Sequence, residues 1–264
     1  MTNLASLDGT LGSADDLRIP VTDEGLLRGD GAFEVMRLYR GRPFALSDHF
    51  ARLRHTCEGL RLEADHDALS GELDALLEAA GPVDALLRVV LTRGGRRIAI
   101  VEPLPERPPV ARVATISYSP NRILDNLKTL SYAGNMLAGR LAKEQGYDEG
   151  LFVTPHGRVL EGPTWTFFWV HEGTLCTPPL EDHILASITR ARLLEECEVS
   201  ERACTLDDLR VAEEAFIAST VREVMPISVV DEIELPSAPG PVTIDAHSRF
   251  QARVERELAA TAPV

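Results

Sequence analysis

The sequence has no apolar run that approaches the roughly 18 residues of a membrane-spanning helix. Residues 1–16 carry neither a basic start nor a long apolar stretch, so we do not expect a secretory signal peptide. Lysine and arginine form no extended block and the formal net charge is −14, whereas nucleic-acid binding needs a basic face. The sequence therefore predicts a cytoplasmic protein that binds neither membranes nor nucleic acid, and its acidity favours solubility.

Cysteine is scarce, and no two cysteines form the C-x-x-C pair that is typical of zinc sites. The seven histidines include no H-E-x-x-H motif, and no G-x-S-x-G motif marks a serine nucleophile. We therefore predict no metal site, and we expect reduced thiols at Cys57, Cys176, Cys197 and Cys204.

The 264 residues, of which 44% are hydrophobic, suffice for a sizeable core in one large or two modest domains. Residues 31–38 alternate as a strand does. Ser47 is expected to cap a helix that buries one face, made of Phe50, Leu53, Cys57 and Leu60. A second helix is expected over about residues 67–80, and buried strands at 85–92 and 110–118 with a glycine- and proline-containing loop between them.

The rest of the chain mixes strands and helices without strict alternation. Helices are expected at 131–145, at 244–259 and from a cap at Ser187 to about Cys197, and strands at 150–154, 158–161, 166–171, 174–177, 215–219 and 227–230. This pattern predicts an α+β protein with largely antiparallel strands. We expect two domains, residues 1–118 and 119–264, with a ligand site between them.

Two charged residues have positions that suit chemistry. Lys128 lies among apolar residues just before a predicted helix, although lysine is normally a surface residue. A lysine in apolar surroundings has a lowered pKa and becomes a nucleophile for carbonyl groups. Glu161 ends a predicted strand before Gly162-Pro163, where a carboxylate can face a cleft and pair with a pyridinium nitrogen. Taken alone, each residue is better explained as a solvated surface charge.

Two segments have the character of phosphate-binding loops. Residues 187–190 open a predicted helix whose free backbone N–H groups suit an anion. Ser219-Thr220 follow a predicted strand and offer hydroxyl and N–H donors. Arg52, on the first helix, can reach a phosphate with its fork of donors. A helix cap, a turn and an exposed arginine would explain these residues just as simply, each taken alone.

The order of these motifs along the chain is more specific than any one of them. Together they resemble the class IV aminotransferases, a family that uses pyridoxal 5'-phosphate (PLP) and includes branched-chain aminotransferases, D-amino acid transaminases and aminodeoxychorismate lyases. The resemblance covers roughly residues 20–230 in six blocks, which are Gly29–Glu34, His49–Leu53, Leu127–Tyr132, Glu161-Gly162, Ile188–Arg190, and Ser219-Thr220 with Glu223–Pro226.

The resemblance implies roles for particular residues. Lys128 is expected to be the catalytic lysine that carries PLP as a Schiff base, Glu161 the partner of the pyridine nitrogen, and Tyr132 a neighbour of the cofactor hydroxyl. Phosphate contacts are implied for Arg52, Ile188, Thr189, Ser219 and Thr220. The fold of the family implies a smaller N-terminal α/β domain, a larger C-terminal PLP-binding domain with a mostly antiparallel barrel-like sheet, and a homodimer that completes the active site.

Three further positions bear on the substrate. Trp165 departs from the small polar residues that the family shows after the glutamate, so we assign it no role, and we expect its bulk to reshape a pocket that Phe33 also lines. Arg88 resembles in position a strand arginine of branched-chain aminotransferases that faces the substrate, and a solvent-facing arginine is the alternative. The run Thr92-Arg93-Gly94 instead resembles D-amino acid transaminases and aminodeoxychorismate lyases.

The resemblance predicts a PLP-dependent transaminase, of the branched-chain or a related type, that moves an amino group between an amino acid or amine and a 2-oxo acid. The alternative within the family is 4-amino-4-deoxychorismate lyase, which releases pyruvate and yields 4-aminobenzoate. The two reactions share the lysine and differ in where the substrate's electrons leave. A protein that binds PLP without catalysis is a third possibility, and the loss of Lys128 or Glu161 would signal it; both are present.

Overall fold

The computed structural model describes residues 3–260, which form two compact units. Unit 1 contains residues 3–106 and 127–132, and unit 2 contains residues 107–126 and 133–260. Between residues 3 and 260 the chain therefore passes between the units three times, and the short stretch 127–132 belongs with unit 1. The domain boundary expected after residue 118 stays a prediction.

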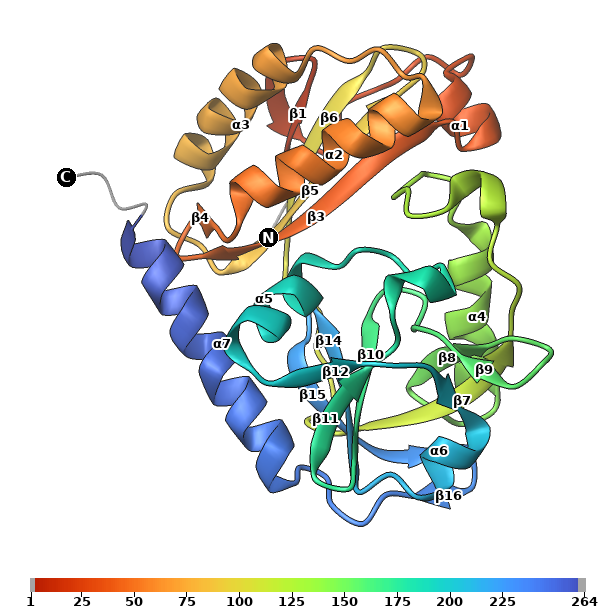
Figure 1. The fold of residues 1–264 in the computed structure, drawn as a ribbon. Helices are drawn as coiled ribbons and strands as arrows, with labels where there is room; N and C mark the ends of the chain where they lie inside the picture. The colour runs from red at the N-terminus through yellow and green to blue at the C-terminus, as the bar shows by residue number, and fades with distance from the viewer. Residues whose placement is uncertain (1–2, 261–264) are drawn as a thin grey trace. The chain divides into compact units, whose positions relative to one another are not determined.

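Unit 1 is a six-stranded sheet in the order β2-β1-β6-β5-β3-β4, antiparallel throughout, with two long helices on one face (Figure 1). Its strands are β1 (Leu4–Leu7), β2 (Thr10–Ser13), β3 (Gly31–Tyr39), β4 (Arg42–Pro43), β5 (Ala85–Thr92) and β6 (Arg97–Glu102). Its helices are α1 (Glu24–Arg28), α2 (Leu46–Leu60) and α3 (His66–Ala80).

The core of unit 1 lies between the sheet and these two helices. Helix α2 packs on β3, and α3 packs on β1 and β6. Alternate residues of β3 and β5 point into this core, so Met36 and Val89 are buried against Leu53 of α2 and Leu73 of α3. The opposite face of the same strands carries the intervening residues, beginning with Phe33.

Unit 2 is built on a mixed sheet in the order β12-β11-β10-β14-β15-β7-β8-β9-β13, with β16 paired to β15. Its strands are β7 (Ala111–Ser117), β8 (Glu149–Val153), β9 (Arg158–Val159), β10 (Thr166–His171), β11 (Thr174–Thr177), β12 (Val199–Glu201), β13 (Cys204–Thr205), β14 (Glu214–Ser219), β15 (Glu223–Val230) and β16 (Ile233–Glu234). Its helices are α4 (Ala133–Glu144), α5 (Ile188–Glu196), α6 (Leu206–Arg210) and α7 (Pro241–Ala260), with short 3₁₀ turns at Arg122–Leu124 and Leu180–Asp182.

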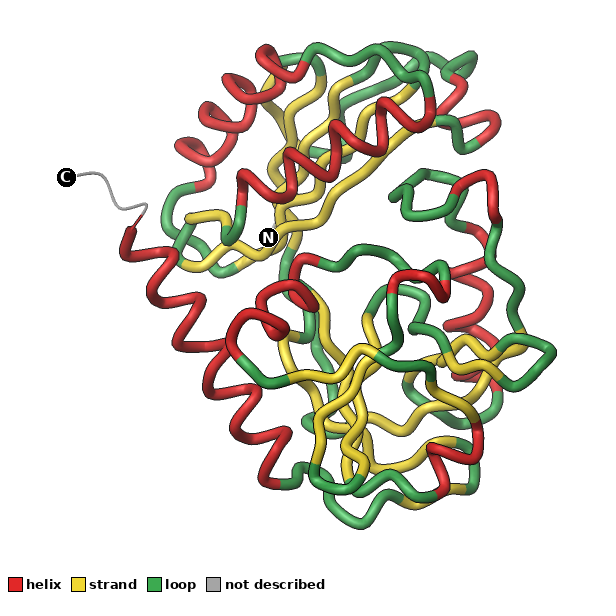
Figure 2. Tube along the Cα trace, viewed as in Figure 1, coloured by secondary structure: helices red, strands yellow, loops and turns green. Residues whose placement is uncertain are grey.

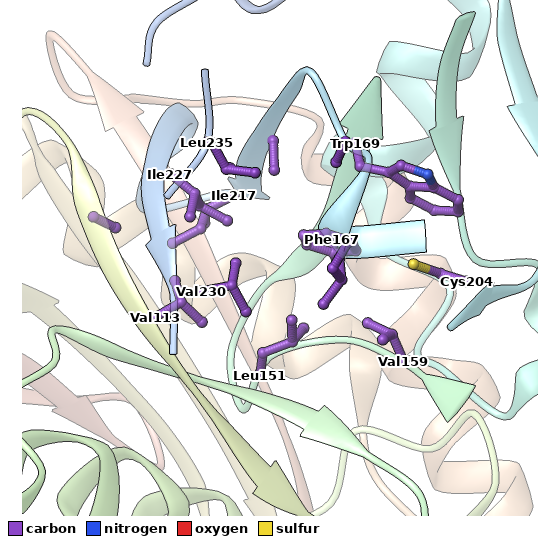
Figure 3. Close-up of a cluster of buried hydrophobic side chains, with 14 of the residues drawn as sticks. Val113, Leu151, Val159, Phe167, Trp169, Cys204, Ile217, Ile227, Val230 and Leu235 are labelled. Carbon is purple, nitrogen blue, oxygen red and sulfur yellow. The ribbon is translucent and has the colours of Figure 1, made fainter. Parts of the chain in front are cut away.

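The core of unit 2 gathers side chains from strands that are far apart in the sequence. Phe167 and Trp169 of β10 lie close to Val159, Cys204 and Ile217 in this cluster (Figure 3). Helices α5 and α7 pack on each other, and α7 also packs on β14 and β15. Over residues 3–260, no helix combines the length and apolar character that crossing a bilayer would require.

The predicted fold class is confirmed, because helices and strands mix along the chain (Figure 2) and most strand pairs are antiparallel. Every strand pair of unit 1 is antiparallel. The expected "α/β" label for this domain therefore holds only in the sense that it contains both helices and strands, because the sheet is not built from parallel strands. The predicted strands 85–92, 166–171 and 174–177 have the observed bounds, and Ser187 caps α5 as expected. All four cysteines are free thiols.

Some elements differ from the prediction for local reasons. Ser47 is not a helix cap: the chain reverses at Ala45, whose φ is 53°, and α2 starts at Leu46 without a side-chain cap. The loop expected between 92 and 110 contains strand β6, because the glycines lie in the preceding turn and the prolines follow the strand. Strands β1 and β2 were also missed.

Candidate functional site

Lys128 lies on a short extended segment that is bonded to the beginning of β3. Its carbonyl accepts the N–H of Phe33 (3.1 Å), and its own N–H donates to Thr56 Oγ1 on α2 (3.2 Å). The next residues continue the pairing, since Thr129 bridges Ala32 and the N–H of Leu130 donates to the carbonyl of Gly31 (2.9 Å). These bonds explain why α4 starts at Ala133 and not at residue 131 as predicted: the residues before it extend along the sheet.

The Lys128 amine lies beside a pair of aromatic rings. Its Nζ is 4.4 Å from the centroid of the Phe33 ring and 5.7 Å from that of Tyr132. The two rings meet edge to face with their centroids 5.1 Å apart. Both distances are within the range in which an ammonium group is attracted to an aromatic ring, and the Lys128 side chain is half-buried. Three residues singled out by sequence, Lys128, Tyr132 and Phe33, thus come together in unit 1.

Arg52 is fixed by a buried carboxylate. Its Nε and Nη2 donate to Oε1 and Oε2 of Glu34, each at 2.7 Å, and Glu34 is fully buried. Burial alone would raise the pKa of Glu34, but the charge and hydrogen bonds of Arg52 and the contact with His49 lower this pKa to about 2. Because Arg and carboxylate meet in a bidentate pair, the guanidinium has one orientation.

His49 completes this cluster on α2. Its Nδ1 lies 2.8 Å from Oε2 of Glu34, and its side chain is buried. Burial lowers the pKa of His49, and the positive charges of Arg52 and Lys128 lower it further against the opposing effect of Glu34. The imidazole is therefore neutral at physiological pH. The influence of Lys128 also shows that the lysine and the Arg52 cluster are neighbours within unit 1.

Glu161 lies in unit 2, just after β9. Its Oε1 accepts the N–H of Leu185 (3.0 Å), so the carboxylate is oriented by the loop that leads into α5. Tyr118 is its electrostatic neighbour: burial raises the pKa of the Tyr118 phenol, and the charge of Glu161 raises it further. Tyr118 is itself fixed by stacking on Phe152, with ring centroids 4.0 Å apart.

The loop before α5 is held in place by residues that precede Lys128. Asn126 Oδ1 accepts the N–H of Ala186 (2.8 Å), and Asp125 Oδ2 lies 2.6 Å from Nδ1 of His183. Helix α5 then opens at the Ser187 cap, with Ile188 and Thr189 buried. The first N–H groups of a helix have no acceptor within it, so those of Ile188 and Thr189 are suited to an anion.

Ser219 and Thr220 lie where β14 ends, and α5 packs on β14 within unit 2. Ser219 Oγ accepts the N–H of Arg222 (3.0 Å), which closes the turn. Arg222 is held in turn by Glu149, to which its Nε donates at 2.8 Å. The two predicted phosphate-binding segments therefore lie on elements that pack together.

Arg88 shares a face of the unit 1 sheet with Phe33. The pairing of Phe33 with Val90 and of Val35 with Arg88 places all four side chains on the face away from α2 and α3. The Arg88 guanidinium forms a bidentate ion pair with Glu102, with Nε–Oε1 at 2.7 Å and Nη2–Oε2 at 2.9 Å. The positive charge of Arg88 is therefore neutralised by Glu102, and the arginine does not point alone into solvent.

Trp165 packs into the core of unit 2, where its side chain is 3% exposed. Its ring lies against Gly162, and a Cβ at that position would come within 1.9 Å of Cε2 of the tryptophan. Trp165 in this position thus requires a glycine at position 162. The bulk that departs from the family pattern is accommodated in the core.

Sequence reasoning missed several residues that orient the predicted ones. Glu34 had a usable signal, because it is a charge on the inward-facing side of an alternating strand between Ala32 and Met36. No sequence signal marks the other four, because each acts through a partner that is distant in the sequence; they are Asn126, His183, Tyr118 and Glu102.

Comparison with known proteins places the chain among related sequences. The family model described as amino-transferase class IV matches residues 31–230. A putative branched-chain-amino-acid aminotransferase of Methanocaldococcus jannaschii is 33% identical over 253 residues, covering 85% of this chain and 87% of that protein. D-alanine aminotransferase of Bacillus licheniformis is 29% identical over 278 residues (96% and 98% covered). Aminodeoxychorismate lyase of Bacillus subtilis is 29% identical over 263 residues (89% and 88%).

Solved structures agree in fold as well. A fold IV-transaminase from Curtobacterium pusillum has a TM-score of 0.82 and 28% identity, with 95% of this chain and 99% of that chain covered. A branched-chain amino acid aminotransferase from Thermobaculum terrenum in its PLP form has a TM-score of 0.85 and 25% identity, with 97% and 95% covered. The resemblance in the sequence and the expected fold are thereby confirmed.

Proposed function

The chain belongs to the class IV aminotransferase family, and from that premise we propose that it is an aminotransferase of the branched-chain or a related type, which moves an amino group between an amino acid or amine and a 2-oxo acid. The cofactor of the family is PLP. The observation that carries the proposal is the Lys128 amine, which lies close to the rings of Phe33 and Tyr132 on a segment bonded to β3.

The residues present fit this cofactor group by group. PLP has an aldehyde, a phosphate and a pyridine nitrogen, which call for an amine, an anion site and a carboxylate. Lys128 supplies the amine, and Glu161 supplies a carboxylate already oriented by the N–H of Leu185. The anion site is assigned to Arg52, the N–H groups of Ile188 and Thr189, and the hydroxyls of Ser219 and Thr220.

When bound, PLP accepts the electron pair that is released when a bond at the substrate's amino carbon breaks. Lys128 Nζ is the group that would hold the cofactor's aldehyde, and as a free amine it would accept and return the proton at the substrate's amino carbon. Glu161 would pair with the pyridine nitrogen. Arg52, immobilised by Glu34, would bind the phosphate, and Tyr132 would neighbour the cofactor hydroxyl.

The test uses the fact that the sequence contains two lysines, Lys128 and Lys143. After incubation with PLP and reduction with borohydride, mass spectrometry of the peptides should find the cofactor on Lys128. Lys143→Ala, which removes an exposed lysine of α4, should leave labelling and activity unchanged. Lys128→Ala should lose the label and about 10²–10⁴-fold in rate, as expected when a general acid–base group is removed. Labelling at Lys143, or full activity of Lys128→Ala, would refute the role of Lys128.

A lyase reaction is the second candidate, and the similarity to the Bacillus subtilis lyase favours it. The run Thr92-Arg93-Gly94 adds little support for a lyase, because its side chains make structural hydrogen bonds. Thr92 donates to Asp23 (2.8 Å), and Arg93 donates to the carbonyl of Leu60 at the end of α2 (2.8 Å). Release of pyruvate from aminodeoxychorismate, without a 2-oxo acid acceptor, would favour the lyase.

The resemblance to the family also supports two proposals about organisation. We propose domains at residues 1–118 and 119–264, and a homodimer in which both subunits complete each active site. Sedimentation of the PLP-loaded protein tests the dimer.

A further inference from the structure

The face of the unit 1 sheet that carries Phe33 is mostly apolar and half-exposed. Pairing of β3 with β5 and of β5 with β6 places three rows of side chains on it. The row nearest Lys128 is Phe33, Val90 and Ile98; the next is Val35, Arg88 and Ile100; the third is Arg37, Leu86 and Glu102. Arg88 is thus one row away from the ring that contacts the Lys128 amine.

The charge of Arg88 is neutralised from its own sheet. Glu102 lies on the neighbouring strand, diagonally opposite Arg88, and accepts from both Nε and Nη2. Both side chains remain partly exposed, at 35% and 23%. Arg37, the other cation of this face, lies a row farther from Lys128, with its guanidinium 5.0 Å from the ring centroid of Tyr39.

We propose that Glu102 determines specificity by holding Arg88, so that the enzyme prefers substrates with neutral side chains over those with a second carboxylate. This inference rests on the proposed function, because that function places the substrate beside Lys128. A neutral side chain beside Phe33 meets Val35 and Val90 and leaves the ion pair intact.

A substrate with a side-chain carboxylate meets two penalties on this face. It has to displace Glu102 from Arg88, although Glu102 is held on the adjacent strand at a high effective concentration. The displaced Glu102 then lies unpaired beside the incoming carboxylate, and like charges in contact disfavour the complex. Glutamate, aspartate and 2-oxoglutarate are therefore expected to be poor substrates, whereas neutral amino acids and pyruvate avoid both penalties.

The test is Glu102→Gln, which keeps the shape of the side chain and removes its charge. The ratio of kcat/KM for 2-oxoglutarate to kcat/KM for pyruvate is expected to rise by about tenfold or more, because Arg88 becomes available to the second carboxylate. Arg88→Gln is expected to lower the same ratio, because it leaves the Glu102 carboxylate without its partner.

Glu72→Gln is the matched control. Glu72 forms the same kind of ion pair with Arg97, with Nη2–Oε1 at 2.7 Å, and Arg97 lies on β6 like Glu102. Arg97 pairs with Leu91, which places this ion pair on the helix-covered face. Glu72→Gln is therefore expected to leave the substrate ratio unchanged.

Calorimetric titration with glutarate, a dicarboxylate that cannot react, separates this inference from the proposed function. Tighter binding of glutarate to Glu102→Gln than to the wild type supports the proposal that Glu102 holds Arg88 away from carboxylate ligands, even if the protein proves not to be an aminotransferase. Equal glutarate affinity and an unchanged substrate ratio would overturn it. Equal changes in kcat/KM for both acceptors would also overturn it, since Arg88 would then bind the carboxylate that all substrates share.

Discussion

At the scale of single residues, the buried Glu34 shows how one ion pair serves both stability and the candidate site. Its carboxylate has no access to water and is stabilised by Arg52 and His49. A buried ion pair is not a strong source of stability by comparison with apolar packing, but removing one partner leaves an uncompensated charge. Arg52 thus depends on Glu34 for its position and for its tolerance of burial.

This arrangement predicts a specific pH dependence. The pKa of Glu34 is lowered from 4.5 to about 2 in the folded protein, so its stabilisation is fully present above pH 4.5 and is lost as the pH falls towards 2. The lowering corresponds to about 3 kcal/mol, with the largest part lost by pH 3. Urea unfolding of the wild type and Glu34→Gln between pH 7 and pH 3 should show a difference that shrinks with acid.

Glu58→Gln provides the comparison, since Glu58 is exposed on the same helix. Its unfolding free energy should follow that of the wild type at every pH. A gap between the wild type and Glu34→Gln that stayed constant down to pH 3 would contradict a depressed carboxylate pKa at position 34.

At the scale of elements, local patterns predicted what local physics determines. Strand β5 and helix α3 were found within a residue or two because a short apolar run and a helical repeat of leucines identify them. Strand β6 was missed because its flanking glycines and prolines dominate the pattern, although its pairing with β1 and β5 stabilises it. Pairing between distant segments leaves no periodic signal in either of them.

Helix α7 depends on another such distant contact. Its first turn is capped by Glu214 of β14, which is 3% exposed. Oε1 accepts the N–H of Val242 (3.0 Å), and Oε2 accepts the N–H and the hydroxyl of Thr243 (2.8 and 2.7 Å). A carboxylate at a helix N-terminus satisfies free donors and complements the helix dipole.

Glu214→Ala is therefore expected to lower the free energy of unfolding by about 3 kcal/mol, because it leaves buried donors without an acceptor. Thermal unfolding followed by circular dichroism measures the change. Glu213→Ala should cost little, since the adjacent Glu213 is exposed and accepts only long bonds from the N–H of Gly173 (3.2 and 3.3 Å). Similar losses in both variants would argue against a capping role for Glu214.

At the scale of the whole molecule, the order of motifs along the chain allowed the family and the candidate residues to be predicted. Their surroundings were not predictable in the same way. Lys128 follows the start of unit 2 in the sequence but belongs to unit 1, because its segment bonds to Gly31 and Phe33. The partner that holds Arg88 was likewise not identifiable, since it is fixed by the register of β5 against β6.

The candidate cofactor residues are divided between the units, with Lys128 and Arg52 in unit 1 and Glu161 and Thr189 in unit 2. If both sets bind one PLP molecule, the cofactor stabilises the fold only when both are intact. At 100 times the dissociation constant, PLP should contribute about 2.7 kcal/mol and raise the Tm of the wild type by several degrees. Lys128→Ala and Glu161→Gln should each lose most of this increase.

Scanning calorimetry with and without PLP measures these shifts, and pyridoxal without the phosphate serves as the ligand control. Glu213→Gln changes an exposed carboxylate of unit 2 and should retain the full increase in Tm. If PLP failed to raise the Tm of Lys128→Ala but raised that of Glu161→Gln as much as that of the wild type, Glu161 would not belong to the cofactor site. That result would contradict the proposed pairing of Glu161 with the pyridine nitrogen, because a ligand raises the Tm only through groups that it contacts in the folded state.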